Sequence, residues 1–304
     1  MSGYWTVRAN DGTRLRAWDN GSDGVPVIIS NGLGSPPAAW PAVTEKSSGF
    51  RVVTWYHRGL GGSQRPLDAG AIQVEHHVAD LGSVMESAGI ERALIIGWSM
   101  GVNVAFEFAQ TQPERVAGIL AVGGIPGGSL TSMFGSVGMP RHLREPVGRM
   151  SAQMLRISGP WLSLLGAAIP RSHHPLSRTG IEALAREAGH AGALAAVLRE
   201  FLAHDWDWYS RLVLAAGDHR PIDVSSVGFP VTLLAGRHDS ITSSDDIVAV
   251  AQTIPGARVS VLPAGTHFLP LQYPGLMLEE LRRLTLREVS GETGGTQDDA
   301  AEPA

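Results

Sequence analysis

A serine flanked by glycines is the residue of this chain best suited to nucleophilic chemistry. Ser99 lies in the pattern Gly-Trp-Ser-Met-Gly at residues 97–101, directly after the apolar residues 93–96 and before a helix-like segment, residues 102–110. A serine at such a strand-to-helix turn is held in a strained backbone conformation with its hydroxyl projecting from the sheet. The five-residue pattern also arises by chance, so the rest of the chain must supply the partners that a nucleophile needs.

A serine hydroxyl attacks an acyl carbon only when a base takes its proton, and the base is usually oriented by an acid. Two residues in the C-terminal third fit these roles. Asp239 follows the apolar residues 231–235, and His267 follows the apolar residues 258–262. The alternative for Asp239 is to cap the helix expected just after it, which is a common role for aspartate. Acyl transfer predicts that both side chains lie near the serine.

Composition excludes several classes of function. The chain has 304 residues, 43% of them hydrophobic, which is enough for one large core in a single domain. The net charge is -5 without a basic run, which argues against nucleic acid as a partner. The absence of cysteine excludes disulfides and thiol nucleophiles.

The sequence shows neither a secretory signal nor a membrane-spanning segment. Residues 1–5 show no basic segment followed by an apolar run, so no secretory signal is expected. The longest apolar stretch, residues 154–169, is interrupted by Ser158-Gly159-Pro160 and is too short to span a bilayer, so a core or cap element is expected there. We therefore expect a cytoplasmic protein without stable membrane insertion that acts on a small molecule.

The pattern of apolar residues predicts an α/β fold. Residues 5–9 and 14–18 flank the turn signal Asn-Asp-Gly-Thr, which predicts an N-terminal antiparallel hairpin. Continuous apolar runs follow at residues 25–30, 51–55, 93–96, 116–122, 231–235 and 258–262. Such runs are typical of strands buried on both faces of a parallel sheet, and helix-like segments separate them.

Residues 125–221 differ from the rest of the chain. A Gly/Pro-rich entry is followed by amphipathic segments such as residues 181–202. The apolar side chains that fall near one helical face there are Leu184, Ala188, Leu194, Val197, Leu198 and Phe201. We predict a helical cap inserted after the sixth strand, a core made of residues 1–124 and 222–289, and a disordered tail at residues 290–304.

Taken together, the chain resembles the α/β-hydrolase fold superfamily, specifically its capped esterase and lipase-like serine hydrolases. The motifs that carry the resemblance are Asn31-Gly32-Leu33-Gly34 after the third strand, Tyr56-His57-Arg58-Gly59-Leu60-Gly61-Gly62-Ser63 after the fourth, the Ser99 turn after the fifth, and Gly236-Arg237-His238-Asp239 and Gly265-Thr266-His267-Phe268 after later strands. The resemblance implies a mostly parallel sheet flanked by helices. It also implies a triad of Ser99, Asp239 and His267, in the chain order usual for this fold.

The resemblance also implies an oxyanion hole made by the backbone N–H groups of Leu33 and Met100. The usual loop of the family reads His-Gly, whereas this chain has Asn31-Gly32, a change that leaves the donor in place but alters how the loop is anchored. Relatives often carry a glycine where this chain has Val102. The residues we expect to contact substrate are Gly32, Trp98, Trp161, Trp206 and Phe268.

Other polar motifs are expected to be structural. His57 and Arg58 resemble a family motif that ties the loop after the fourth strand beneath the site, and Asp80 fits the same role. The histidine pairs 76–77 and 173–174 lack a metal-binding array and are expected to be surface or loop residues. We expect no metal and no cofactor. Epoxide hydrolases and haloalkane dehalogenases, which resemble this fold, use aspartate at the position of Ser99.

The function expected is hydrolysis of a carboxylic ester through an acyl-enzyme. The cap is rich in Leu, Ala, Met and Trp, which favours a lipophilic acyl group, although cap helices also need apolar faces simply to pack. The same triad serves lactonases, carbon–carbon bond hydrolases, acyltransferases and perhydrolases, and a non-catalytic ligand receptor with this fold is a further alternative. For a carbon–carbon hydrolase, the cations available to hold an acidic substrate are Arg141, Arg144, Arg149 and Arg156.

Overall fold

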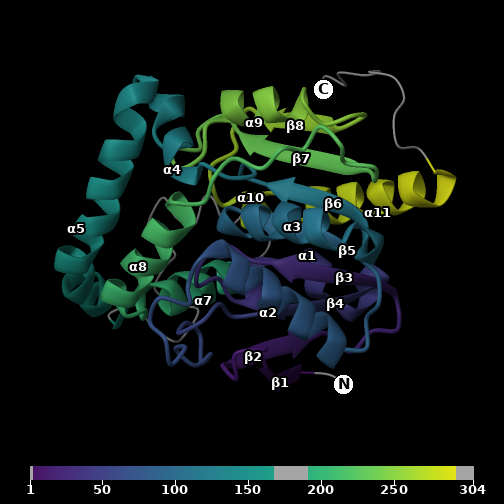
Figure 1. Ribbon diagram of the computed structural model, residues 1–304, viewed down its shortest axis with the longest axis horizontal. Helices are drawn as coiled ribbons and strands as arrows, with labels where there is room; N and C mark the ends of the chain where they lie inside the picture. Colours follow the sequence, from purple (N-terminus) through teal and green to yellow (C-terminus); the bar gives the residue numbers. More distant parts are fainter. Residues whose placement is uncertain (1–2, 168–190, 292–304) are drawn as a thin grey trace.

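An eight-stranded sheet organises the chain in the computed structural model, which describes residues 3–167 and 191–291 (Figure 1). The strand order is β1-β2-β4-β3-β5-β6-β7-β8. The strands are β1 (Gly3–Arg8), β2 (Arg14–Asp19), β3 (Val25–Ser30), β4 (Phe50–Trp55), β5 (Ala93–Trp98), β6 (Val116–Val122), β7 (Val231–Gly236) and β8 (Arg258–Leu262). Strand β1 pairs antiparallel with β2, and β2 pairs antiparallel with β4. The other neighbouring strands, which are β4, β3, β5, β6, β7 and β8 in spatial order, pair parallel. The predicted mostly parallel sheet and N-terminal hairpin are confirmed.

Helices cover both faces of this sheet, which explains why its central strands are apolar throughout. The helices are α1 (Pro41–Thr44), α2 (Val74–Ser87), α3 (Met100–Thr111), α4 (Ser129–Ser132), α5 (Arg141–Ala167), α7 (Ala191–Leu202), α8 (Trp206–Gly217), α9 (Ser244–Ala251), α10 (Leu269–Gln272) and α11 (Pro274–Ser290), with short 3-10 turns at Pro37–Ala39, Lys46–Ser48, Pro113–Arg115 and Gly135–Val137.

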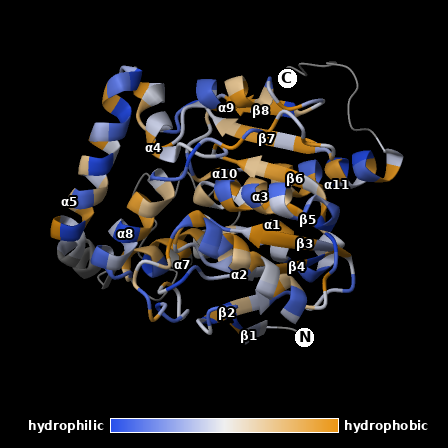
Figure 2. Cartoon of the chain, in the orientation of Figure 1, coloured by the Kyte–Doolittle hydropathy of each residue, from blue (hydrophilic) through white to orange (hydrophobic). Residues whose placement is uncertain are grey.

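Alternate side chains of each central strand enter opposite cores. In β5, Ile95 packs in the core that includes α2 and α3, whereas Leu94 and Ile96 pack in the core that includes α1 and α11. Figure 2 shows apolar residues concentrated on these strands. Two-sided burial accounts for the continuous apolar runs in the sequence.

The order in which the chain adds strands to the sheet reverses at β3, because β4 lies on one side of β3 and β5 lies on the other. The chain passes from β3 to β4 and then returns through α2 to β5. In open α/β sheets, this reversal separates the loops at the carboxyl ends of the strands and opens a crevice between them. The loops after β3 and β5, which hold Leu33 and Ser99, lie at this reversal.

The described residues between β6 and β7 include the helices α4, α5, α7 and α8. Figure 1 shows α5 and α8 on the side toward which the arrowheads of β6 and β7 point. The predicted segment 181–202 is described only from Ala191 onward, as α7. Residues 181–190, the histidine pair 173–174 and the tail from residue 292 lie outside the described residues.

Helix α5 continues through Ser158-Gly159-Pro160, where the apolar stretch is interrupted in sequence. Glycine suits this position because α8 approaches closely: a Cβ on Gly159 would lie 2.1 Å from the Cβ of Trp206. None of the helices in residues 3–167 and 191–291 is both long and apolar enough to cross a membrane.

The entry and exit of the helical segment run side by side. Gly128 N–H donates to the carbonyl of His219, and Ile222 N–H donates to the carbonyl of Pro126. The buried amide of Asn103 in α3 accepts a hydrogen bond from Gly127 N–H at 2.7 Å. The helical segment is therefore attached to the helix that follows Ser99.

Candidate active site

Ser99 occupies the strained turn that its flanking glycines predict. Its backbone angles are φ 55° and ψ -121°, between the end of β5 and the start of α3. A Cβ on Gly101 would lie 1.8 Å from the carbonyl oxygen of Ser30, and one on Gly97 would lie 2.8 Å from the carbonyl oxygen of Gly101. Only glycine fits at these two positions, so the turn packs directly against the end of β3.

Asp239 and His267 form a buried pair. The Nδ1 atom of His267 lies 2.8 Å from Oδ2 of Asp239, and the aspartate is fully buried. The other carboxylate oxygen accepts the N–H groups of Ile241 and Thr242 at 2.8 and 2.9 Å, so the side chain also closes its own turn. Helix α9 has Ser243 as its N-cap instead, so the capping alternative for Asp239 is wrong.

Backbone at the end of β6 packs against both Ser99 and this pair. A Cβ on Gly123 would meet Oδ2 of Asp239 at 3.4 Å and Nδ1 of His267 at 3.5 Å, and one on Gly124 would meet the carbonyl oxygen of Ser99 at 2.6 Å. From the other side, the indole N–H of Trp98 donates to the carbonyl of His267 at 3.0 Å. The three predicted triad residues are therefore gathered around one two-glycine segment.

The loop after β3 presents a backbone donor next to the serine turn. Ser35 N–H donates to the carbonyl of Gly32 at 3.1 Å, and Gly34 has φ +73°, as the third residue of a type II turn requires. The turn bond does not use Leu33 N–H. Met100 is the first residue of α3, where a helix leaves its N–H groups without an acceptor in the preceding turn.

The side chain of Asn31 anchors this loop. Its amide oxygen accepts the indole N–H of Trp40 at 2.6 Å, and its amide nitrogen donates to the hydroxyl of Thr54 at 3.1 Å. All three side chains are buried. The asparagine that replaces the usual histidine of the family therefore ties the loop to the neighbouring strand β4 and to the 3-10 turn before α1.

The residues expected to contact substrate fall into two groups. A Cβ on Gly32 would lie 3.4 Å from the ring of Trp98, and Phe268, which is 37% exposed, lies beside both Trp98 and His267. Trp206 is buried between Phe201 and Tyr209, and Trp161 is 71% exposed on α5. Gly32, Trp98 and Phe268 are thus close to the proposed triad, whereas Trp206 and Trp161 belong to the helical segment.

Arg58 ties down the loop after β4, as the structural interpretation expects. Its guanidinium makes two hydrogen bonds of 2.7 Å to Asp80 and a further one to Asp11. Burial raises the pKa of the Asp80 carboxyl above its ordinary value, and the guanidinium opposes that rise. Both Arg58 and Asp80 are buried, so the pair serves to hold α2 against the loop.

The expectation that His77 is a surface residue is wrong. His77 is buried in α2, and its ring stacks edge to face on that of His57 with centroids 5.1 Å apart. Burial lowers the pKa of His57 to about 4 and lowers the pKa of His77 well below its ordinary value. His77 faces inward because it shares a helical face with Val74 and Leu81.

Each of the four arginines considered as a cation for an acidic substrate is paired with an acidic side chain. Arg141 and Arg144 contact Asp246, at 3.2 and 2.9 Å. Arg149 contacts Glu145 and Asp218, and Arg156 contacts Asp207 at 2.7 Å. These arginines hold the helical segment to α9 and to itself.

Two docking residues of the helical segment carry no recognisable signal in the sequence. His204 lies 3.0 Å from the carbonyl oxygen of Gly34, and the indole N–H of Trp208 donates to the carbonyl of Arg58 at 2.8 Å. These contacts join residues 170 and 150 positions apart, so only the packing of the segment on the core shows them.

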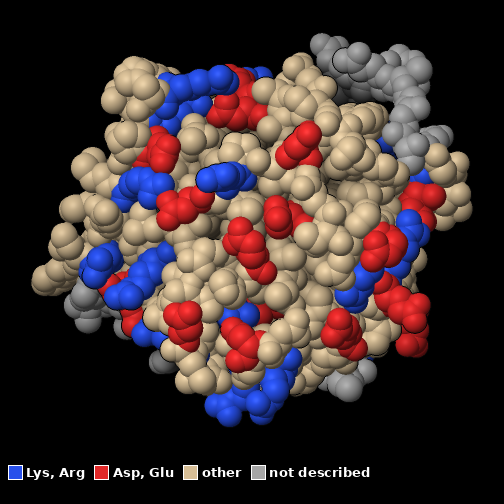
Figure 3. All heavy atoms as spheres, in the orientation of Figure 1, with Lys and Arg blue, Asp and Glu red and all other residues tan. Residues whose placement is uncertain are grey.

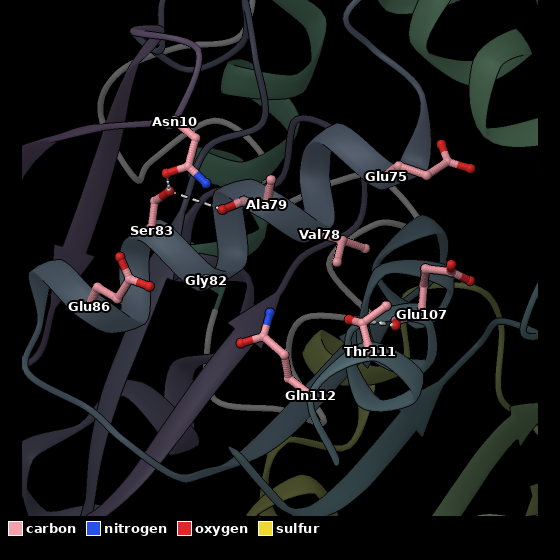
Figure 4. A pocket seen from close by; sticks show the side chains of 10 residues that line it. All are labelled: Asn10, Glu75, Val78, Ala79, Gly82, Ser83, Glu86, Glu107, Thr111 and Gln112. Carbon is pink, nitrogen blue, oxygen red and sulfur yellow. Dashed lines mark hydrogen bonds between the residues drawn. The ribbon is translucent and has the colours of Figure 1, made fainter. Parts of the chain in front are cut away.

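An open groove between α2 and α3 is separate from this site (Figure 4). Glu75, Glu86 and Glu107 line it, and acidic side chains are visible over this face in Figure 3. The groove borders the C-terminal half of α3, whereas Ser99 precedes the N-terminal end of that helix. Within residues 3–167 and 191–291, no cluster of histidine and acidic side chains is suited to a metal ion.

The fold and this site define a hydrolase. Residues 25–274 match the model of the alpha/beta hydrolase fold family, so the chain belongs to that family. The resemblance seen in the sequence is thereby confirmed.

Among curated proteins, the chain is 25% identical to the proposed carbamate hydrolase RutD of Azorhizobium caulinodans, over 85% of this chain and 90% of that protein. It is 32% identical to epoxide hydrolase A of Mycobacterium tuberculosis, over 37% of this chain and 36% of that protein. The match to RutD of Caulobacter segnis, at 33% identity, likewise spans only 32% of this chain and 37% of that protein.

Solved structures show the same fold over nearly the whole chain. The enol-lactonase from Burkholderia xenovorans has a TM-score of 0.72 at 22% identity and covers 93% of this chain and 100% of its own. A thermophilic esterase from Thermogutta terrifontis has a TM-score of 0.69 at 20% identity, covering 94% of this chain and 99% of its own.

Proposed function

We propose that this hydrolase cleaves a carboxylic ester through an acyl-enzyme, with Ser99 as nucleophile, His267 as general base and Asp239 as the acid that orients it. The observation that carries the proposal is the 2.8 Å contact between His267 and Asp239, beside a serine in a strained turn. Strained residues of this kind persist where the surrounding structure holds them for a function.

In the proposed reaction, Nε2 of His267 takes the Ser99 proton as the hydroxyl attacks the acyl carbon. The imidazole then gives that proton to the leaving alcohol, and water releases the acyl group by the same steps. Because Asp239 accepts from Nδ1, it fixes the tautomer that leaves Nε2 free to act as base. The same contact offsets the positive charge that develops on the imidazole.

The tetrahedral intermediate carries a negative charge that needs fixed donors. We assign this role to the N–H groups of Leu33 and Met100. Support comes from the type II turn at residues 32–35 and from the packing of the Ser99 turn against the end of β3. Both donors belong to backbone that is held by its surroundings before substrate arrives.

A lipophilic acyl group is the substrate that the neighbouring side chains favour. Phe268 follows His267 and is partly exposed, and Leu33 and Met100 are apolar. Pairing of the four arginines in the helical segment disfavours an acidic carbon–carbon bond substrate held by them. We assign residues 125–221 as a cap over this site, which would exclude water from the acyl group.

Hydrolysis of p-nitrophenyl esters with acyl chains from short to long tests the proposal. Wild type is compared with Ser99→Ala and with Ser226→Ala, whose serine is exposed on a distant loop. We expect activity that disappears in Ser99→Ala and is unchanged in Ser226→Ala. Wild-type activity in Ser99→Ala would contradict the proposal, and a medium or long chain optimum is expected if the acyl pocket is lipophilic.

A further inference from the structure

Several contacts hold the corner between α7 and α8 on the core. Asp205 caps α8 by accepting the N–H groups of Asp207 and Trp208, and it also pairs with Arg65 of the core at 2.6 Å. Three residues later, the indole N–H of Trp208 donates to a core carbonyl. His204, at the same corner, contacts the loop that carries Leu33.

His204 is buried, with 8% of its surface exposed, and its Nε2 lies 3.0 Å from the carbonyl oxygen of Gly34. Since a carbonyl oxygen only accepts, Nε2 must carry the proton. The ring stacks on Tyr209 at an interplanar angle of 15° and meets Phe201 edge to face. Burial lowers the pKa of His204 and so favours the neutral ring, although the hydrogen bond to Gly34 opposes that shift.

The fit of this ring on the loop is close. A Cβ on Gly34 would lie 2.0 Å from Nε2 of His204, so the imidazole fills the space that a side chain would take. Gly34 also has the positive φ that closes the type II turn. On the opposite side of Leu33, the side chain of Asn31 is bonded to Trp40 and Thr54. Leu33 N–H therefore lies between two anchors, one from the core and one from the helical segment.

We propose that His204 is a positioning residue, which holds the loop after β3 so that Leu33 N–H points at the developing oxyanion. The inference rests on the acyl-transfer function proposed above. Without the bond to His204, the turn at residues 32–35 keeps its anchor at Asn31 but loses the one at Gly34. A backbone N–H that is not held in a fixed position stabilises the transition state less, while the binding of the ground-state ester changes little.

The test compares His204→Phe, which keeps the ring volume but lacks the donor, with His204→Gln, which keeps a side-chain N–H. His142→Phe is the matched control, because His142 is exposed on α5. Removal of one oxyanion donor costs about 10²–10³ in kcat. Because His204 acts through the loop, we expect kcat of His204→Phe to fall about 10-fold to 100-fold with KM within about two-fold. Most of that loss should be recovered in His204→Gln.

A transition-state analogue separates this role from a general loosening of the site. The Ki of an acyl trifluoromethyl ketone should rise in His204→Phe by the same factor by which kcat/KM falls. An unchanged kcat in a folded His204→Phe, or an equal loss in His204→Gln, would overturn the proposal. If phenylalanine does not fit, His204→Leu gives the same comparison with a smaller side chain.

A fluorophosphonate probe distinguishes failure of this inference from failure of the proposed function. Wild type that neither reacts with the probe at Ser99 nor turns over any ester would contradict the acyl-enzyme itself. Wild type that reacts and turns over ester, beside a His204→Phe with the same rates, would contradict only the role of His204.

Discussion

The buried histidines beneath the site predict a specific loss of stability in acid. Burial lowers the pKa of His57 from its ordinary value of 6.5 to about 4. Below pH 6.5 the unfolded chain binds a proton at this residue, whereas the folded protein does not until about pH 4. The contribution of His57 to the free energy of unfolding is therefore fully present above pH 6.5 and is lost as the pH falls toward 4.

The magnitude follows from the size of the shift. Each pH unit inside this window changes the free energy of unfolding by about 1.4 kcal/mol for one proton. Acidification from pH 7 to pH 5 should therefore cost about 2 kcal/mol through His57 alone. His77, which is also buried, steepens the dependence further, because its pKa is lowered as well.

Urea unfolding followed by tryptophan fluorescence, at pH values from 5 to 7.5, measures this dependence. We expect His57→Gln to lose stability with falling pH less steeply than wild type, by close to one proton, whatever its stability at pH 7. His142→Gln, at an exposed position of α5, serves as the control and should keep the wild-type slope. A wild-type slope in both His57→Gln and His77→Gln would refute the reasoning.

Three further predictions concern the candidate active site. Gly101→Ala should prevent formation of the serine turn, because the added Cβ would lie 1.8 Å from a carbonyl oxygen at the end of β3. Expression and melting temperature measure this, and the control Gly275→Ala, where a Cβ meets nothing within 4 Å, should be normal in both. Trp98→Phe removes the N–H that donates to the carbonyl of His267 and should lower kcat by about 10-fold; the melting temperature should also fall, because the smaller ring leaves a cavity at this buried position. Asp239→Asn should lower kcat by about 10³–10⁴, because the amide favours the wrong tautomer of the base, and wild-type turnover by this variant would exclude Asp239 as the acid.

The sheet could be predicted because the information for it is local. Strands buried on both faces need apolar residues at every position, so β3 and β6 were visible as uninterrupted runs with the bounds that the structure shows. The serine turn was visible for a similar reason, since two close backbone approaches require glycine at fixed distances from Ser99.

The burial of His77 follows from the spacing of its apolar neighbours in the sequence. Its position in α2 follows Val74 by three residues and precedes Leu81 by four, so the three share one face of the helix. The adjacent histidine at position 76 suggested an exposed pair. The spacing of the apolar neighbours was the better guide to burial.

The contacts of His204 and Trp208 could not have been predicted in this way. Both depend on how the α7–α8 corner lies on loops that are separated from it by 150 residues or more. A histidine or tryptophan in an amphipathic helical segment is compatible with packing, exposure or substrate contact, and the sequence does not distinguish these. Trp206, expected to contact substrate, packs within the aromatic cluster that supports His204.

The same segment also holds the loop that carries Asp239. Phe134 N–H donates to the carbonyl of Ser240 at 2.8 Å, and the hydroxyl of Ser136 donates to the carbonyl of Asp239 at 2.6 Å. Phe134 makes this contact with φ +61°, a conformation that a bulky residue adopts only where its surroundings impose it. Under the proposed mechanism, residues of the helical segment therefore fix both the acid loop and the oxyanion loop. It follows that substitutions in this segment act on the rate of the chemical step as well as on the choice of substrate.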